Sequence, residues 1–325
     1  MEKYKQFKQR VNNALESIAI DKPPIKLYEP IKYIISLGGK RLRPVLLLAA
    51  NDMFGGNEKL AMPAALGLEI FHNFTLLHDD IMDEAAFRRG QATVHKKWNS
   101  NIAILSGDTM FALAYQQFQS LTPSENFADI LQTFTNTAIE VCEGQQYDMD
   151  FETSENVSIT DYLKMIKLKT AVLLGCSLKI GALTAGAKSP QANLLYDFGV
   201  NIGLAFQLKD DYLDAFGDYE KFGKRIGGDI ATNKKTYLYL KCLELANDSD
   251  RKILLNYYHQ VNTDSENKIK TVLGLFEKYD VNNHITIAME KYFVKAVELM
   301  KSVEAPESNK TELLKYTEWL YKREY

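Results

Sequence analysis

Apolar residues recur along most of this chain at the three- and four-residue spacing of amphipathic helices. Stretches such as ALGLEIFHNFTLLHDDIM and ILQTFTNTAIEVCEGQQY show this spacing, whereas few segments alternate with the two-residue period of a strand. Polar or Gly- and Pro-containing breaks separate the helical stretches, at residues 21–24, 54–59, 121–126, 184–190, 216–236, 262–267 and 305–310. The pattern predicts an all-α protein of about ten or more helices.

The 325 residues, 46% of them hydrophobic, are enough to bury a large core. No break is a long linker and no repeat recurs, so we expect one domain over residues 1–325. The net charge of -3 provides no basic field, which argues against nucleic acid or an anionic membrane as a partner.

The cysteines and the N-terminal residues favour a cytoplasmic protein without a membrane segment. Cys142, Cys176 and Cys242 are odd in number and widely separated, which predicts reduced thiols that pack in the core of a cytoplasmic protein. The first residues, MEKYKQFKQR, lack an apolar signal region, and no run of 18 apolar residues follows. We therefore expect no integral membrane segment.

Two acidic motifs interrupt apolar helical patterns. The first, HDDIMD, contains Asp79, Asp80 and Asp83, and the second, KDDYLD, contains Asp210, Asp211 and Asp214 at the same spacing. An isolated motif of this kind is usually a solvated helix end, but these two have apolar neighbours on both sides. The first and last aspartates of each motif share one helix face. Two such helices facing each other would provide the hard oxygen ligands that magnesium prefers.

Basic clusters accompany the acidic motifs in an otherwise acidic chain. They comprise Lys40, Arg41, Arg43, Arg88, Arg89, Lys224, Lys234 and Lys235. Each pair alone is more often a solvated surface, but together they indicate a bound anion, because arginine matches phosphate oxygens. Polar residues within apolar helices, namely Gln145, Lys169, Thr170 and Gln207, are usually satisfied locally, and their pattern alone assigns them no role.

Six motifs occur in a fixed order between residues 38 and 236: GGKRLRP, HDDIMD followed by FRRG, GQQYDM, KTA, FQLKDDYLD and GKRIGGDIATNKKT. In these motifs the chain resembles the polyprenyl synthetase family of trans-isoprenyl diphosphate synthases, of the short-chain geranylgeranyl or farnesyl type. The resemblance implies a homodimer of all-α bundles, each around a deep central cavity. It also implies head-to-tail condensation of isopentenyl diphosphate with dimethylallyl, geranyl or farnesyl diphosphate, through a carbocation formed with the help of about three magnesium ions.

The resemblance assigns roles by matching position. Magnesium ligands would be Asp79, Asp83 and Asp210, with Asp80, Asp211 and Asp214 ligating or orienting in support. Lys169, Thr170 and Gln207 would complete the catalytic set with these acids, the last two near the carbocation. The allylic diphosphate would be held by Arg88, Lys169, Lys224 and Lys234. Isopentenyl diphosphate would be held by Lys40, Arg43, His72 and Arg89.

Product length would depend on the residues that precede the first acidic motif. Helical phase favours Phe71, about 80° from Asp79, over Phe74, about 140° away. The family pattern instead favours Phe74, with the small residue Thr75 next to it and no insertion within the motif, as in archaeal-type geranylgeranyl synthases. We therefore expect a C20 product, with C15 the next alternative, Phe74 as the main stop and Phe71 as the deeper one. Both phenylalanines could instead simply pack the core.

Two other functions are compatible with parts of the sequence. His72 and the HDD sequence are compatible with an HD-type metal-dependent phosphohydrolase, but that function leaves the second acidic motif and the arginines unexplained. An inactive regulatory synthase-like subunit should show damaged motifs, whereas both acidic motifs here are intact.

Overall fold

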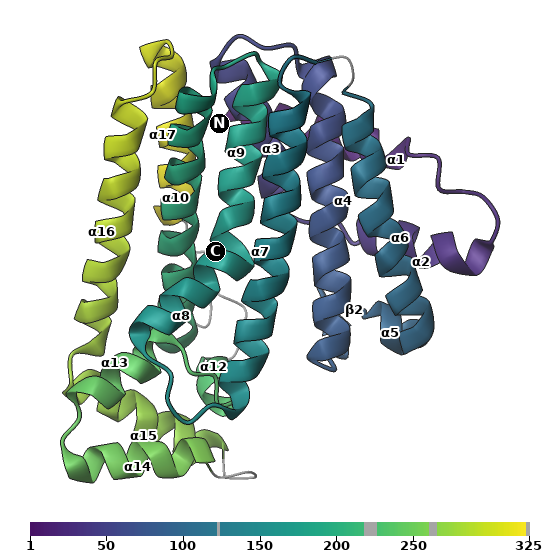
Figure 1. Cartoon of the computed structure of the whole chain (residues 1–325). Coiled ribbons are helices and arrows are strands. Elements are labelled where there is room, and N and C mark those ends of the chain that lie inside the picture. Colours follow the sequence, from purple (N-terminus) through teal and green to yellow (C-terminus); the bar gives the residue numbers. More distant parts are fainter. Residues whose placement is uncertain (122–123, 218–225, 260–264, 323–325) are drawn as a thin grey trace. The chain divides into compact units, whose positions relative to one another are not determined.

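A computed structural model describes residues 1–121, 124–217, 226–259 and 265–322 (Figure 1). The first half contains α1 (Glu2–Glu16), α2 (Ile25–Ser36), α3 (Leu42–Met53), α4 (Glu58–Met82), β1 (Phe87–Arg88), β2 (Gln91–Ala92), α5 (Val94–Lys97), α6 (Ser100–Gln119) and α7 (Phe127–Thr153). The second half contains α8 (Ile159–Ile166), the π-helix η1 (Lys167–Ala171), α9 (Val172–Thr184), α10 (Ser189–Phe216), α12 (Gly228–Ala231), α13 (Tyr237–Leu245), α14 (Asp248–His259), α15 (Ser265–Lys278), α16 (Val281–Lys301) and α17 (Glu307–Lys322). The predicted all-α class is confirmed.

Side-chain caps explain where several helices begin. The Asn57 side chain accepts a hydrogen bond from the backbone of Lys59 at the start of α4, and Asn99 does the same for Ile102 in α6. At the start of α8, Ser158 and Asp161 form a capping box. Each cap satisfies backbone N–H groups that a helix leaves without an intrahelical partner.

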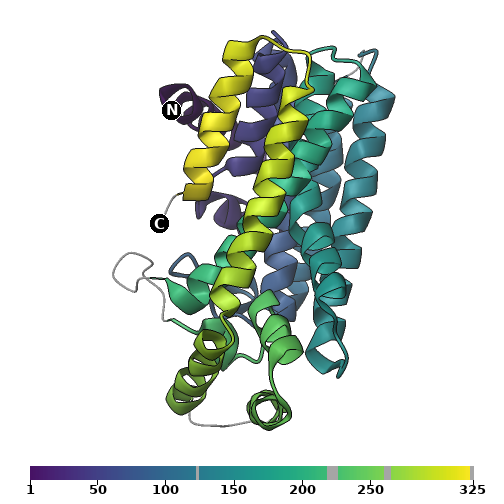
Figure 2. The same cartoon turned by 90° about the vertical axis from the view of Figure 1, so that its left-hand side faces the viewer.

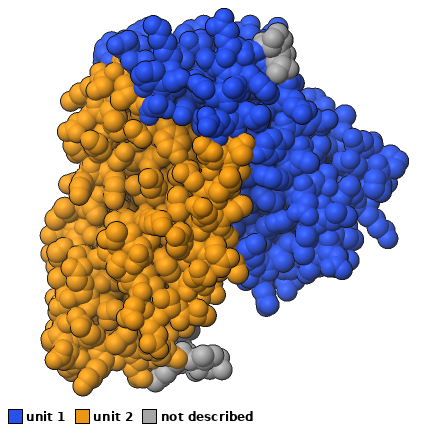
Figure 3. All heavy atoms as spheres, viewed as in Figure 1, with its two compact units in different colours: residues 1–134, 177–193, 304–310 blue, residues 135–176, 194–303, 311–325 orange. Residues whose placement is uncertain are grey.

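The chain forms two compact units, each assembled from three segments (Figure 3). Unit 1 comprises residues 1–134, 177–193 and 304–310, and unit 2 comprises residues 135–176, 194–303 and 311–325, as far as the structure describes them. The first acidic motif belongs to unit 1 and the second to unit 2. That residues 1–325 act as a single domain stays a prediction.

Unit 1 is built around the packing of α4 against α6. A Cβ atom added at Gly67 of α4 would lie 2.9 Å from Phe118, and one at Gly107 of α6 would lie 2.2 Å from the His78 ring. Both glycines therefore allow close approach of the two helices. Helix α4 has enough length and apolar composition to pass as a membrane span, yet 61% of its apolar window is buried inside the fold, as in the core helix of a soluble protein.

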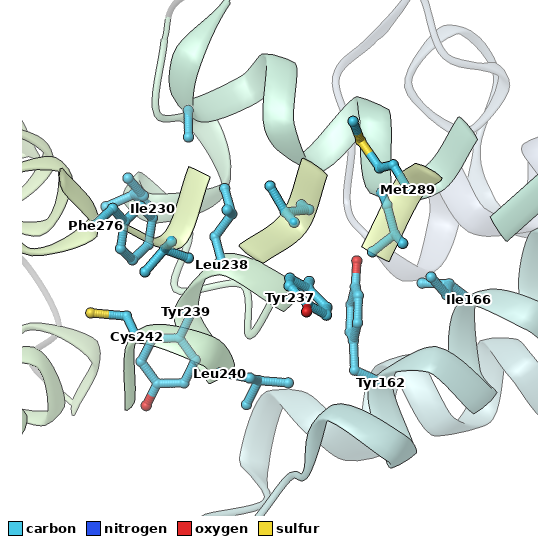
Figure 4. Close-up of a cluster of buried hydrophobic side chains, with 14 of the residues drawn as sticks. Tyr162, Ile166, Ile230, Tyr237, Leu238, Tyr239, Leu240, Cys242, Phe276 and Met289 are labelled. Atoms are coloured by element: carbon cyan, nitrogen blue, oxygen red, sulfur yellow. The ribbon is translucent and has the colours of Figure 1, made fainter. Parts of the chain in front are cut away.

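Unit 2 has its own apolar core, formed by residues of α8, α10 and α12 to α16 (Figure 4). Tyr239 and Tyr258 stack within it, with ring centroids 4.0 Å apart. Helix α16 and the later part of α17 lie side by side along this unit, where Phe293 and Tyr321 stack (Figure 2). Several of the core residues come from beyond residue 236, where the sequence carries no motif.

Two details differ from the sequence-based expectations. A two-stranded hairpin, with Phe87 paired to Ala92, lies in the FRRGQA segment, which was too short to show a strand period. The three cysteines, all described, form no disulfide, and Cys176 and Cys242 are buried. Cys142 is exposed, so a core-packing role for it is wrong. It lies on α7, whose polar face the helical period did not separate from the core face.

Candidate active site

The middle aspartate of the first acidic motif is held by Arg88. Asp80 is only 2% exposed, and Arg88 Nε lies 2.8 and 2.9 Å from its two carboxylate oxygens. Arg88 Nη2 adds a contact of 2.7 Å. The outer residues are more accessible, since Asp79 is half-buried and Asp83 is exposed at the end of α4. The geometry therefore gives Asp80 an orienting place and puts Arg88 beside the motif.

The hairpin separates the two arginines of FRRG. Arg89 and Gly90 both have positive φ, 53° and 76°, which defines a tight two-residue turn between β1 and β2. Arg88 reaches the acidic motif, whereas the Arg89 guanidinium donates to the carbonyl of Gly38. A Cβ at Gly39 would lie 2.8 Å from Arg89, so the second glycine of GGKRLRP makes room for this arginine.

Arg41 anchors the GGKRLRP loop and does not project as a ligand would. It is 6% exposed, in the left-handed region with φ of 51°. Its guanidinium donates to Glu69 Oε1 at 2.7 Å, to the Ile35 carbonyl at 2.7 Å and to Asn12 Oδ1 at 3.1 Å. The buried pair with Glu69 thereby fixes a loop in which Lys40 remains exposed.

Arg43 and His72 meet beside this loop. Arg43 Nη1 lies 3.0 Å from His72 Nε2, and since arginine only donates, this ring nitrogen accepts. Burial, and then the positive charges of Arg43 and Arg89, hold the pKa of His72 well below its usual value. Burial also lowers the pKa of Arg43, to about 10, so it stays charged. Unit 1 thus brings close together Arg43, His72 and Arg89, three of the residues that the sequence analysis assigned to isopentenyl diphosphate.

In the second acidic motif, which lies in unit 2, the middle aspartate is again buried and held by another side chain. Asp211 is 4% exposed, and the hydroxyl of Tyr162 donates to its Oδ2 at 2.5 Å. Burial raises the pKa of Asp211 well above its usual value. Asp210 is exposed, and Asp214 accepts a hydrogen bond of 3.0 Å from the backbone N–H of Asp229 at the start of α12.

The two neighbouring lysines of the IATNKKT segment have different places. Lys235 Nζ donates to the carbonyls of Phe151, Glu152 and Ser154, at 2.7, 3.2 and 2.6 Å, and so caps the end of α7. The Lys234 side chain is 65% exposed and lies 3.6 Å from Asp229. Lys234 is thus the better placed of the two to bind a ligand. The predicted ligand Lys224 lies outside the described residues.

The KTA segment lies in the π-helix η1, a wider turn that often marks functional sites. A Cβ at Gly144 of α7 would lie 2.2 Å from the Lys169 backbone nitrogen, and one at Gly203 of α10 would lie 2.6 Å from Ala171. These two glycines therefore let neighbouring helices close on η1. Lys169 Nζ donates to Asp148 Oδ2 at 2.6 Å, and Thr170 is half-buried.

Gln207 is half-buried on α10, one turn before Asp210.

On α4, Phe71 is fully buried and touches Phe74, Phe111 and Phe134, with ring centroids 5.2 to 5.8 Å apart. Phe74 and Phe111 are half-buried and 5.3 Å apart. The Thr75 hydroxyl donates to the His72 carbonyl. An aromatic cluster thus precedes the first acidic motif in unit 1.

The donor set suits magnesium. Within the described part of the chain, no three His, Cys, Asp or Glu side chains gather into a site that would hold a metal alone. Magnesium is commonly held by one or two carboxylates, with waters and substrate phosphate oxygens completing its shell. The outer aspartates of each motif, more exposed than the middle one, fit that mode of binding.

Comparisons with known proteins agree with this all-α fold. The polyprenyl synthetase family model matches residues 24–276. The chain is 38% identical to the geranylgeranyl diphosphate synthase of Sulfolobus acidocaldarius over 94% of this chain and 93% of that protein. A crystal structure of a geranylgeranyl pyrophosphate synthase superposes with a TM-score of 0.93 at 46% identity, over 98% of both chains. The geranylgeranyl pyrophosphate synthetase of Pyrococcus horikoshii gives a TM-score of 0.91 at 30% identity, over 99% of this chain and 98% of that one.

The chain belongs to the polyprenyl synthetase family and is a short-chain trans-isoprenyl diphosphate synthase. The substrates of such enzymes are isopentenyl diphosphate and allylic diphosphates. The comparisons do not support the phosphohydrolase alternative or the inactive subunit.

Several residues that shape the site were not found from the sequence. Glu69, Tyr162 and Asp148 hold Arg41, Asp211 and Lys169. Asp148 lies within the GQQYDM motif, which was a usable signal. Glu69 and Tyr162 lie in ordinary helical patterns, and only the fold brings them to their partners.

Proposed function

We propose that this enzyme extends allylic diphosphates with isopentenyl diphosphate to a C20 product. The observation that carries this product length is the aromatic cluster that precedes Asp79. Half-buried Phe74 and Phe111 contact fully buried Phe71, and together the three rings would form an apolar surface that stops a growing chain. The geranylgeranyl synthases among the relatives support the same length.

In this proposal the acidic motifs hold the leaving group of the allylic substrate. Asp79, Asp83 and Asp210 would ligate magnesium with Asp214 in support, about three ions being required with substrate bound, while Asp80 and Asp211 orient the motifs. When bound, the metal neutralises charge on the departing diphosphate. Arg88, Lys169, Lys224 and Lys234 would bind that diphosphate directly, and Lys169 would exchange its bond with Asp148 for the substrate.

The second substrate would bind at the basic loop of unit 1. Lys40, Arg43 and Arg89 would neutralise the diphosphate of isopentenyl diphosphate, and His72 would donate to it once the anion compensates for the surrounding arginines. Thr170 and Gln207 would offer oxygen dipoles to the positive charge that develops on the allylic carbon. The proton lost at the end would go to the released diphosphate.

We further propose that residues 1–325 work as a single domain within a homodimer in the cytoplasm. The family match supports the first of these points, because residues 24–276 run through both units. The buried thiols of Cys176 and Cys242 are consistent with a reducing compartment.

Product analysis tests this function. The enzyme is incubated with labelled isopentenyl diphosphate and dimethylallyl, geranyl or farnesyl diphosphate, and the dephosphorylated products are separated by length. We expect C20 to dominate from every starter. Accumulation of C15 with no extension of farnesyl diphosphate, or of products beyond C20, would contradict the proposed length.

A further inference from the structure

Lys268 is a buried lysine outside every motif of the sequence. It lies on α15, is 2% exposed, and donates its ammonium to Asn233 Oδ1. The ammonium also lies 4.9 Å from the centre of the Tyr258 ring. Burial lowers the pKa of this ammonium, and among the described residues no carboxylate pairs with it to oppose that effect. Burying an ammonium group is costly unless it is hydrogen-bonded. Loss of the bond to Asn233 should therefore destabilise the fold.

Asn233 occupies a turn that few residues adopt. Its φ is 61°, in the left-handed region, where asparagine is tolerated better than most residues. The turn closes α12, with the Asn233 N–H bonded to the Ile230 carbonyl and the Lys234 N–H bonded to the Asp229 carbonyl. The side chain held by Lys268 therefore belongs to the residue that sets the direction of Lys234.

A continuous set of contacts links this turn to the second acidic motif. Lys234 lies 3.6 Å from the Asp229 carboxylate, and the Asp229 N–H donates to Asp214 at 3.0 Å. Helix α15 also supports the other end of α12, because a Cβ at Gly227 would lie 2.7 Å from Ile269. Thus α15 holds both ends of the short helix that joins Asp214 to Lys234.

We propose that Lys268 is a positioning residue for the allylic diphosphate, acting through Asn233 on Lys234. It touches no substrate. The proposal rests on the role of Lys234 given under the proposed function, and it assigns to the region after residue 236 a part in substrate binding that the motifs do not cover.

Two substitutions at Asn233 separate the hydrogen bond from the backbone turn. Asn233→Gly keeps the left-handed turn but removes the acceptor, whereas Asn233→Asp keeps an acceptor on a residue that tolerates this φ. We expect Asn233→Gly to raise the KM for farnesyl diphosphate about tenfold. The KM for isopentenyl diphosphate should stay within about twofold, because the basic loop of unit 1 is untouched. Asn233→Asp should keep both constants within about twofold of the unsubstituted enzyme.

Lys268→Met tests the donor, since methionine retains an apolar stem but no N–H. Alone it should raise the KM for farnesyl diphosphate as Asn233→Gly does. Combined with Asn233→Gly, it should raise that KM no further. The double variant should also melt at a higher temperature than Asn233→Gly alone, because it no longer buries an ammonium that has lost its acceptor. Lys270→Met, at an exposed position of the same helix, should change nothing.

Lys234→Ala, measured in parallel, separates this inference from the proposed function. A raised KM in Lys234→Ala with an unchanged KM in folded Asn233→Gly would overturn the positioning role and leave the function intact. An unchanged KM in Lys234→Ala would overturn the assigned role of Lys234, and the role of Lys268 with it. If the variants at Asn233 and Lys268, Asn233→Asp included, raised the KM for both substrates alike and lowered the melting temperature, Lys268 would have a purely structural role.

Discussion

Tyr162 donates its hydroxyl to Asp211 across 2.5 Å, inside the core of unit 2. Burial, and then the charge of Asp211, raise the pKa of this phenol well above its usual value, so it remains a donor. The bond turns the middle aspartate of the second motif inward, as Arg88 does for Asp80 in the first. In both motifs the middle aspartate is thus buried and bonded to another side chain, whereas the outer aspartates are more exposed.

This division predicts unequal effects within one motif. Asp210→Asn should lower kcat by about a hundredfold or more with little effect on the fold, because a proposed metal ligand is lost. Asp211→Asn should cost activity less, since an amide can still accept from Tyr162 and occupies the same volume. Steady-state kinetics with circular dichroism distinguishes the two variants. Equal losses in kcat would contradict the division.

Removing the donor should act mainly on stability. Tyr162→Phe leaves the Asp211 carboxyl buried without this partner, which should lower the free energy of unfolding by about 1–3 kcal/mol. Urea unfolding at neutral pH measures the change, and Tyr147→Phe, whose hydroxyl bonds an exposed lysine, is the control. A Tyr162→Phe protein as stable as the control would show that the hydrogen bond carries little weight.

Product length should respond to the aromatic cluster in a defined order. Phe74→Ala or Phe111→Ala should each shift the product from C20 toward C25, and the double change Phe74→Ala with Phe71→Ala should lengthen it further. The deletion of buried rings also lowers stability. Phe118→Leu, on α6 beside Phe134 of this cluster, should keep the C20 product. Chromatography of the products would contradict the assignment if folded variants all gave C20.

His72 predicts a pH dependence of stability. Its pKa in the folded protein lies well below the ordinary value of about 6.5 that the unfolded chain has. Below pH 6.5 the unfolded chain therefore binds a proton that the folded chain does not, and the free energy of unfolding falls as the pH falls. Above that pH the contribution is flat. His72→Gln, which cannot take up the proton, should show a shallower loss between pH 7 and 5 in urea titrations, and an equal slope would contradict the burial of a neutral imidazole.

The helical period predicted most of this fold because long amphipathic helices dominate it. The predicted break at residues 54–59 covers the junction of α3 and α4, and that at 184–190 covers the junction of α9 and α10. The hairpin at FRRGQA could not be predicted, because two-residue strands are too short to show a period, although a glycine such as Gly90 is compatible with a turn. The motifs predicted the candidate site residues, and among these the structure places Arg88 beside Asp80 and Arg43 beside His72. The roles of Glu69, Tyr162 and Lys268 could not be predicted from the sequence. Nothing in a helical pattern distinguishes such a polar residue from an exposed one until the residue that it contacts in the fold is known.

Release of diphosphate with and without isopentenyl diphosphate tests the central claim most directly. The enzyme is given magnesium and farnesyl diphosphate, and free diphosphate is measured together with incorporation of labelled isopentenyl diphosphate. A prenyltransferase should release one diphosphate for each isopentenyl unit incorporated, and next to none when the second substrate is withheld or a chelator is added. Release at an undiminished rate without isopentenyl diphosphate would contradict the account.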